Sequence, residues 1–473
     1  MVSFLKNIDI PLYWLSNSLF STAIISIYEL SMAIQHKYVE DFKNLLDPKQ
    51  NTILNMSLVE AEEAVLSGDP QRVREIDGSF AIVKKKGKEV FMARSIGRPM
   101  RYFLAKQKSG PLLIVAERID EIFEYLKDKG LHEQFHPSYT RMVPAHHITR
   151  LQLLGCPDPS PEYKRYFDPK QNVMDTDLDV IGEKYIGALT YECQQWLQTI
   201  PEDEPIGVLF SGGIDSGSVF LVLYHLMLEM GLSPQRLKAF TLSVEGGADV
   251  EQAKEFLDQL DMSLYLEIMD ISADELDYKK TIQIMEDYKP LDVEAATMTE
   301  ALCRQIRNRY PDWKYLADGD GGDENMKDYP LDENPELTIL SVLNNQMLYH
   351  EGWGVDKIKH SLTYSGGLSR GHVRTYAPTK FHGFKGFSPY TLPNVIEVSE
   401  GIPFIQLTDW EPKQLYALKG EIVQRGVKAV TGLDMPVFPK RRFQHGALPQ
   451  DKAEKLFADS EMEYRRYFSS LYR

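Results

Sequence analysis

The chain has 473 residues, of which 43% are hydrophobic and 26% charged, and its formal net charge is −16. This balance is typical of a folded protein of several domains, and the acidic charge without a long basic run disfavours a nucleic-acid partner. Cys156, Cys193 and Cys303 lie far apart and form no CxxC pair. The sequence therefore predicts no disulfide framework and no structural zinc site, but free thiols in a cytoplasmic protein.

The start of the chain is apolar from about residue 8 to residue 34. Asn17, Glu29 and several serines interrupt this segment, which has neither a basic flank nor a small-residue cleavage site. No uninterrupted run approaches the roughly 20 apolar residues that a membrane-spanning helix needs. We expect the segment to form core of the first domain, without membrane association; a membrane anchor is the alternative.

Turns and prolines divide the front of the chain from the rest. Residues 77–117 consist of short apolar runs separated by turns, which is typical of β-hairpins. The sequence Cys-Pro-Asp-Pro-Ser-Pro at 156–161 predicts a linker. We predict a first domain over residues 1–155, a linker over 156–176 and a second domain over 177–473.

Strands and helices are expected to alternate in the second domain. The expected strands are 206–210, 238–244, 264–268 and 314–317, and the expected helices are 177–197, 216–230, 250–260 and 298–309. Beyond about residue 330 we expect mostly helices with irregular loops. Alternating strands and helices predict an α/β domain with a parallel, doubly wound sheet.

The most informative stretch is Ser-Gly-Gly-Ile-Asp-Ser at residues 211–216, between a buried strand and a helix. A strand–loop–helix turn presents backbone N–H groups and a helix N-terminus to an anion. Gly212 and Gly213 permit close approach of a phosphate, and Ser211 and Ser216 supply hydroxyl groups. Asp215 suits an anion site only with a cation between, so we predict that it binds Mg²⁺. The loop lacks the lysine of GxxxxGK[ST], which favours release of pyrophosphate from ATP. The structural alternative is a glycine-rich turn with capping serines.

A second acidic loop, Asp-Gly-Asp-Gly-Gly-Asp-Glu at residues 318–324, follows the strand expected at 314–317. Ligands bind at the carboxyl ends of parallel strands, so both loops should lie at one edge of the sheet. We predict that Asp318 and Gly319 contact ATP and that Asp323 shares the metal with Asp215. The spacing does not fit an EF-hand. A solvated acidic turn is the structural alternative.

These two loops, in this order, resemble the synthetase domain of the asparagine synthetase family, which pairs SGG[LI]DS with an SGEGADE-like loop. Residues 243–249, Ser-Val-Glu-Gly-Gly-Ala-Asp, resemble the family's second strand and the following helix start. Residues 440–446, Lys-Arg-Arg-Phe-Gln-His-Gly, match its late lysine loop. The resemblance implies binding of ATP and Mg²⁺, and a catalytic role for Lys440 at the reacting acyl centre. A solvated basic loop is the alternative for Lys440.

The front domain resembles the family's N-terminal glutaminase, an α+β domain of the Ntn-hydrolase type. Asp-Gly-Ser-Phe-Ala-Ile at 77–82 is similar to its DGxFAFA strand, and the stretch 94–102 is similar to RDxxGxxPLYY. Residue 2 is Val2, where active glutaminases of the family carry cysteine, and no counterpart of RGPD or NGEIYN is present. We expect a structural domain without glutaminase activity.

The chain combines a glutaminase-like domain that lacks its catalytic residues with a retained synthetase site. In this combination it resembles β-lactam synthetases, carbapenam synthetases and lasso-peptide cyclases. One departure concerns the family's GLExRxPFLD segment, which maps to residues 383–390. Lys385 stands at the Glu position and Phe387 at the Arg position. In β-lactam synthetases this Glu and a Tyr together form the catalytic base. Tyr349 lies at a suitable distance upstream, but without the Glu the pair is incomplete.

The resemblance implies an AMP-forming amide ligase that activates a carboxylate as an acyl-adenylate for attack by an amine. The expected partners are a small-molecule or peptide carboxylate and an amine donor, either ammonia or an amine of the substrate itself; a homodimer stays open. Asparagine synthesis from ammonia is one alternative. A base-adenylating sulfur-transfer enzyme is disfavoured by the scattered cysteines, and a non-catalytic scaffold is disfavoured by the intact first loop.

Overall fold

The computed structural model describes residues 41–108, 110–152, 161–328, 339–344, 371–439, 456–457 and 460–473. The apolar segment 8–34, Cys156, Tyr349 and Lys440 lie outside these residues. Within them, no helix combines the length and apolar character needed to cross a membrane. Cys193 and Cys303 are buried free thiols, as predicted.

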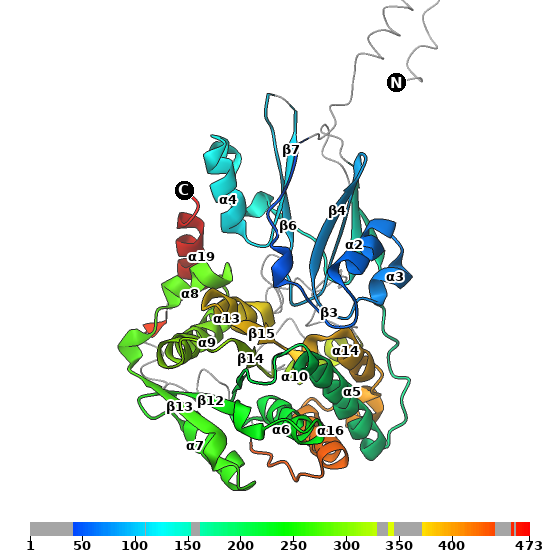
Figure 1. Cartoon of the computed structure of the whole chain (residues 1–473), viewed down its shortest axis with the longest axis vertical. Helices are drawn as coiled ribbons and strands as arrows, with labels where there is room; N and C mark the ends of the chain where they lie inside the picture. The colour runs from blue at the N-terminus through cyan, green and yellow to red at the C-terminus, as the bar shows by residue number, and fades with distance from the viewer. Residues whose placement is uncertain are drawn as a thin grey trace, which may run out of the picture.

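The front of the chain forms two four-stranded sheets (Figure 1). The first has the order β1 (Asp41–Asn44), β7 (Leu112–Ala116), β6 (Arg101–Ala105), β8 (Arg141–Met142). The second has the order β10 (Glu162–Arg165), β9 (His147–Gln152), β5 (Glu89–Arg94), β4 (Ala81–Lys86). The two-stranded pair β2 (Thr52–Ile53) and β3 (Gly78–Ser79) and the helices α2 (Leu58–Ser67), α3 (Pro70–Arg74) and α4 (Ile119–Asp128) complete this part.

Both sheets are buried on two faces because successive side chains of a strand point to opposite sides. Val90 and Met92 of β5 face a core shared with Leu113 and Val115 of the other sheet. The alternate residues of β5 pack instead in a cluster with α2. The alternate residues of β7 pack in a cluster with α4. The front domain is thus an α+β arrangement of two sheets packed face to face, with a helix over each outer face.

Strand β10 lies inside the predicted linker, so that part of the prediction is corrected. Glu162 pairs with Arg150 and Arg165 with His147 in an antiparallel ladder with β9. The strand reads Glu-Tyr-Lys-Arg and lies at the edge of its sheet, where it is largely exposed. An edge strand without an apolar face leaves no periodic signal in the sequence.

The second domain is built on a five-stranded parallel sheet of order β13-β12-β11-β14-β15. Its strands are β11 (Ile206–Leu209), β12 (Leu237–Val244), β13 (Leu266–Ile271), β14 (Tyr315–Ala317) and β15 (Lys385–Phe387). The doubly wound parallel sheet is as predicted. The sequence missed β15, since three residues with a central glycine carry no strand pattern.

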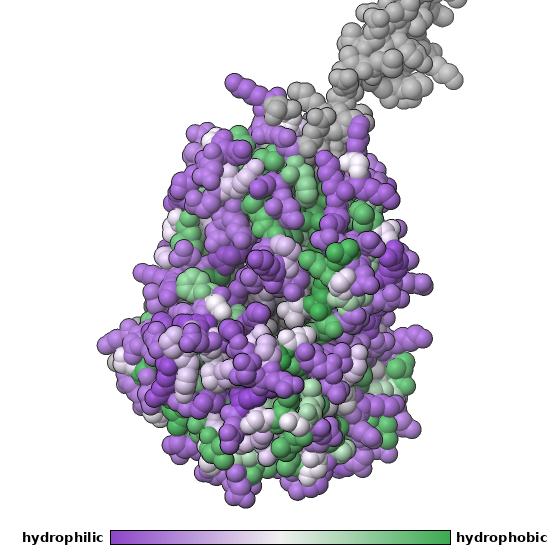
Figure 2. Space-filling model, in the orientation of Figure 1, coloured by the Kyte–Doolittle hydropathy of each residue, from purple (hydrophilic) through white to green (hydrophobic). Residues whose placement is uncertain are grey.

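Helices cover both faces of this sheet (Figure 1). One core cluster joins the central strands to α5, α6 and α16, and another joins β12 and β13 to α9. Among the residues that the structure describes, the domain contains the helices α5 (Leu178–Gln198), α6 (Ile214–Glu229), α7 (Ala248–Asp258), α8 (Tyr278–Met285), α9 (Pro290–Arg309), α10 (Gly322–Asn325), α11 (Ile339–Asn344), the π-helical turn η8 (His372–Tyr376), α13 (Ala377–Phe381), α14 (Pro393–Glu400), α15 (Phe404–Thr408), α16 (Gln414–Thr431) and α19 (Glu461–Ser470). On the face shown in Figure 2 hydrophilic side chains predominate.

The strand order places a switch point between β11 and β14. From β11 the chain proceeds through β12 to β13 on one side, and then crosses to β14 on the other side of β11. In doubly wound sheets ligands bind in the crevice at such a point, outside the carboxyl ends of the strands. Both glycine-rich loops identified in the sequence leave the sheet at this crevice.

Candidate active site at the sheet switch point

The first loop joins β11 directly to α6, which begins at Ile214. Gly212 has a φ of 70°, and a Cβ there would lie 2.9 Å from the backbone of Ala253 in α7. Only glycine therefore fits between the strand end and the neighbouring helix. The backbone N–H of Ser211 donates to Oγ of Ser216 at 3.2 Å, and that of Gly213 donates to Oγ of Ser211 at 3.3 Å. The loop thus gathers N–H and hydroxyl groups at the start of a 16-residue helix, as an anion site requires.

The second loop packs directly against the first. A Cβ on Gly319 would lie 2.7 Å from the backbone nitrogen of Ser216, and a Cβ on Gly322 would lie 2.2 Å from Oδ1 of Asp215. Both values are far below contact distance, so the glycines of one loop make room for the other. The two loops lie together at one edge of the sheet, and Asp215 and Asp323 approach a common point.

That point is occupied by the ammonium group of Lys419 from α16. Its Nζ donates to Oδ2 of Asp215 at 2.6 Å and also pairs with Asp323. The Lys419 side chain is 2% exposed. Burial disfavours its charge, but Asp215 and Asp323 outweigh burial and raise its pKa well above the usual value. Lys419 stays charged and holds the two carboxylates close together.

Sequence reasoning missed Lys419, although one signal was available. Leu415, Leu418, Ile422 and Val423 form the buried stripe of α16, and Lys419 lies on the same stripe. Lysine is almost never fully buried unless it is paired. A charged residue on an apolar helical face therefore indicates a buried partner of opposite charge.

Asp318, predicted to contact ATP, is buried within its own loop. Its Oδ2 accepts from Oγ of Ser388 at 2.8 Å, and its Oδ1 accepts from the backbone N–H of Asp320 at 3.0 Å. Burial raises the pKa of Asp318 to about 7. Ser388 directly follows β15, so Asp318 ties the second loop to a third strand end. Its carboxyl group shapes the loop, while Gly319 lines the cavity beside it.

The two loops border a small cavity of about 70 Å³. Its lining is Asp215, Gly319, Asp320, Gly321, Asp323, Glu324, Gly371 and Arg374. Among the described residues no group of three or more His, Cys, Asp or Glu side chains is arranged to hold a metal. Two carboxylates nevertheless fit Mg²⁺, which proteins bind through one or two carboxylates together with phosphate oxygens of the substrate.

The structure also describes Lys385 and Phe387, which stand at the Glu and Arg positions of the family's GLExRxPFLD segment. Lys385 lies at the amino end of β15, is exposed, and places its Nζ 5.2 Å from the ring centroid of Tyr315. Phe387 is buried and stacks on Trp196, with ring centroids 4.4 Å apart. Lys385 thus begins a strand whose other end leads to the site. Tyr349 and Lys440 lie outside the described residues, so their predicted roles stay predictions.

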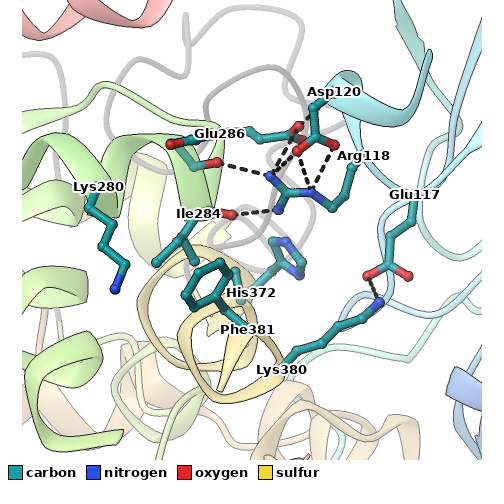
Figure 3. A pocket seen from close by; sticks show the side chains of 11 residues that line it. Glu117, Arg118, Asp120, Lys280, Ile284, Glu286, His372, Lys380 and Phe381 are labelled. Carbon is teal, nitrogen blue, oxygen red and sulfur yellow. Dashed lines mark hydrogen bonds and ion pairs between the residues drawn. The ribbon is translucent and has the colours of Figure 1, made fainter. Parts of the chain in front are cut away.

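A larger cavity of about 340 Å³ lies between α4 of the front domain and α8 and α13 (Figure 3). Nζ of Lys380 pairs with Glu117 at 2.7 Å, and Arg118 pairs with Asp120 at 2.7 Å. Lys280, on the opposite wall, bonds to Glu300 at 3.2 Å. No residue of either glycine loop is among those that line this cavity. The larger cavity is therefore separate from the two glycine loops.

Reciprocal helix capping joins the two domains beside this larger cavity. Nη1 of Arg118, at the start of α4, donates to the carbonyl oxygen of Ile284 near the end of α8 at 2.6 Å. Glu286, just after α8, accepts from the backbone N–H of Ile119 in α4 at 2.8 Å. Glu286 also pairs with buried Arg101 at 2.6 Å. Each charge matches the dipole of the helix end that it meets, so both caps stabilise the junction.

A doubly wound parallel sheet with a glycine-rich anion loop at its switch point defines a nucleotide-binding α/β domain. Residues 198–370 match the model of the family "Asparagine synthase". This part of the chain therefore matches an asparagine synthase domain.

Two curated relatives share less than 30% sequence identity with this chain. "Asparagine synthetase [glutamine-hydrolyzing] 2" of Lotus japonicus is 26% identical over 249 residues, which cover 52% of this chain and 38% of the relative. "Asparagine synthetase [glutamine-hydrolyzing] 1" of the same organism is 28% identical over 132 residues, 27% of this chain and 22% of the relative. The matches therefore span well under half the length of these relatives. The solved NMN synthetase from Francisella tularensis aligns with 51% of this chain and 95% of its own, at 14% identity and a TM-score of 0.21, too low to support an argument.

Proposed function

We propose that this protein is an ATP-dependent carbon–nitrogen ligase that forms AMP and pyrophosphate. It activates a substrate carboxylate as an acyl-adenylate, which an amine then attacks to give an amide. The observation that carries the proposal is the contact between the two glycine loops at the switch point, with Asp215 and Asp323 on one buried ammonium group. Asparagine synthesis from ammonia is one case of this chemistry, whereas the Lotus japonicus relatives are named as glutamine-hydrolyzing asparagine synthetases.

The first loop, the two carboxylates and Lys419 have separate roles in this proposal. The N–H groups of Ser211 to Ser216, at the N-terminus of α6, bind the pyrophosphate part of ATP. Asp215 and Asp323 would hold Mg²⁺, which when bound neutralises charge on the leaving pyrophosphate. Lys419 keeps both carboxylates in place and adds a positive charge beside the phosphates. The loops do no covalent chemistry, so their contribution is positioning and electrostatic stabilisation.

Lys440 and the front domain complete the proposal. By the family resemblance, Lys440 stabilises negative charge at the reacting acyl centre. Replacing Lys440 by alanine should then reduce amide formation by roughly a hundredfold with ATP binding retained. We propose that the front domain is structural and does not hydrolyse glutamine, because the family's glutamine-holding motifs are missing. The cytoplasmic location and the absence of a nucleic-acid partner stay predictions from the sequence.

Analysis of the nucleotide products tests the proposal. Purified protein is incubated with ATP, Mg²⁺, a panel of carboxylic acids and an amine donor, and the nucleotides are identified by mass spectrometry. We expect acid-dependent AMP and pyrophosphate in the wild type and neither in Asp215→Asn, which keeps the shape of the side chain but removes its charge. ADP as the main product would contradict the proposal, as would a complete lack of ATP cleavage with every acid.

A further inference from the structure

Arg374 is a cation at the small cavity that the proposed function leaves without a role. It lies in the π-helical turn η8, and π-helical turns occur frequently at functional sites. Of the described residues that line the cavity, Arg374 alone carries a positive charge, whereas Asp215, Asp320, Asp323 and Glu324 are acidic. A substrate carboxylate entering this cavity would meet mainly negative charge unless Arg374 offset it.

A buried carboxylate fixes the orientation of this guanidinium group. Nε of Arg374 donates to Oδ1 of Asp292 at 2.8 Å, and the Asp292 side chain is 2% exposed. Within the part of the chain that the structure describes, Nη1 and Nη2 of Arg374 have no hydrogen-bond partner. The Arg374 side chain is 23% exposed. Asp292 therefore holds the Nε edge of the planar group, and Arg374 is among the residues that line the cavity.

Arg374 and Lys419 belong to different elements at the site. Lys419 pairs with Asp215 of the first loop, whereas Arg374 belongs to η8. Gly319 and Gly322 of the second loop face the first loop, whereas Asp320 faces Gly371, at 3.5 Å from the position of its missing Cβ. The second loop thus lies between the phosphate loop and η8. Attacking and leaving groups stand roughly in line in phosphoryl transfer. A cation opposite the pyrophosphate loop is therefore placed on the side of the attacking substrate.

We propose that Arg374 binds a carboxylate group of the substrate through Nη1 and Nη2, and that Asp292 is its positioning residue. A guanidinium fork matches the two oxygens of a carboxylate and gives charge-assisted hydrogen bonds, which a lysine cannot reproduce in this geometry. This inference rests on the proposed function for its substrate class, but it concerns binding and is tested without turnover.

The test measures binding by titration calorimetry with α,β-methylene-ATP, which cannot be cleaved between the α- and β-phosphates, and with acetate, malonate and succinate in its presence. Arg374→Gln should weaken binding of the best carboxylate by about tenfold to a hundredfold, as loss of a charge-assisted pair does. Affinity for the nucleotide analogue should stay within about twofold, because the phosphates lie on the other loop. Arg374→Lys, which keeps the charge and most of the packing, should restore the carboxylate affinity only in part.

Two further variants separate recognition from general damage. Asp292→Asn should weaken carboxylate binding without changing nucleotide binding, since only the orientation of Arg374 is lost. Arg304→Gln is the matched control, because Arg304 is 24% exposed and pairs with Glu275 away from the cavity. It should change neither affinity.

Each remaining outcome overturns the proposal. Loss of nucleotide binding with retained carboxylate binding in Arg374→Gln would assign Arg374 to the phosphates. Unchanged binding of both ligands would make Arg374 structural, and a wild type that binds none of the three carboxylates would remove the carboxylate site. Failure of the proposed function looks different: no acid would stimulate AMP release, although Arg374-dependent carboxylate binding persisted.

Discussion

Glu192 gives a quantitative test of the packing between the two domains. It lies on α5 with a fully buried side chain, and Nδ2 of Asn394 donates to its Oε1 at 2.6 Å. Its Oε2 has no hydrogen-bond partner among the described residues. Burial, and then the negative charge of Asp77 in the front domain, raise the pKa of Glu192 from 4.5 to about 8. The folded protein therefore favours the neutral carboxyl group.

The sign of the pH dependence follows from this shift. Between pH 4.5 and about 8 the folded protein keeps a proton on Glu192 that the unfolded chain releases. The free energy of unfolding should therefore fall with rising pH in this window, by up to about 1.4 kcal/mol per pH unit. The full stabilisation is present below pH 4.5, and the total loss above pH 8 is at most about 5 kcal/mol.

Glu192→Gln mimics the protonated side chain and removes this titration. We expect wild type and variant to differ by less than about 1 kcal/mol near pH 5, and the variant to be more stable by roughly 2 kcal/mol or more near pH 9. Urea unfolding followed by circular dichroism from pH 5 to 9 measures the difference. Glu183→Gln, at an exposed position of the same helix, is the control and should follow the wild type. Parallel pH profiles for wild type and Glu192→Gln would refute the reasoning.

Three further substitutions test the loops and the domain junction. Gly322→Ala should abolish AMP release, because the new Cβ would lie 2.2 Å from Oδ1 of Asp215 and force the loops apart. Glu286→Ala should lower the free energy of unfolding by about 3 kcal/mol or more, since it leaves the buried Arg101 guanidinium unpaired, and urea unfolding measures this loss. Lys419→Met should abolish turnover but strengthen Mg²⁺ binding to the nucleotide-free protein, measured by calorimetry, because no ammonium then neutralises Asp215.

Each of these substitutions has a matched control. Gly187→Ala places its Cβ in open space and should leave AMP release intact. Glu124→Ala removes a carboxylate that is 61% exposed and should change stability little. Lys428→Met replaces a half-exposed lysine of the same helix as Lys419 and should change neither turnover nor Mg²⁺ binding. Full activity in Gly322→Ala, a neutral effect of Glu286→Ala, or weaker Mg²⁺ binding in Lys419→Met would each contradict the corresponding argument.

The sequence by itself determined the architecture of the nucleotide-binding domain. Alternating apolar strands and helices predicted the doubly wound sheet, because the periodicity of buried residues is a local property of the chain. The loop at residues 211–216 was readable for the same reason: its glycines, serines and acid are contiguous. The rule that ligands bind at the carboxyl ends of parallel strands placed the second loop beside it.

Only the tertiary structure decided which distant charges meet. Lys419 lies 204 residues from Asp215 along the chain, and Arg374 lies 82 residues from Asp292. No local signal identifies the partner in either pairing, since any of 53 basic and 69 acidic residues is a formal candidate. Strands β10 and β15 were missed because a short edge strand owes its conformation to the ladder it joins rather than to its own side chains. The sequence therefore located the two glycine loops, whereas packing of remote helices against the sheet brought Lys419 and Arg374 beside them.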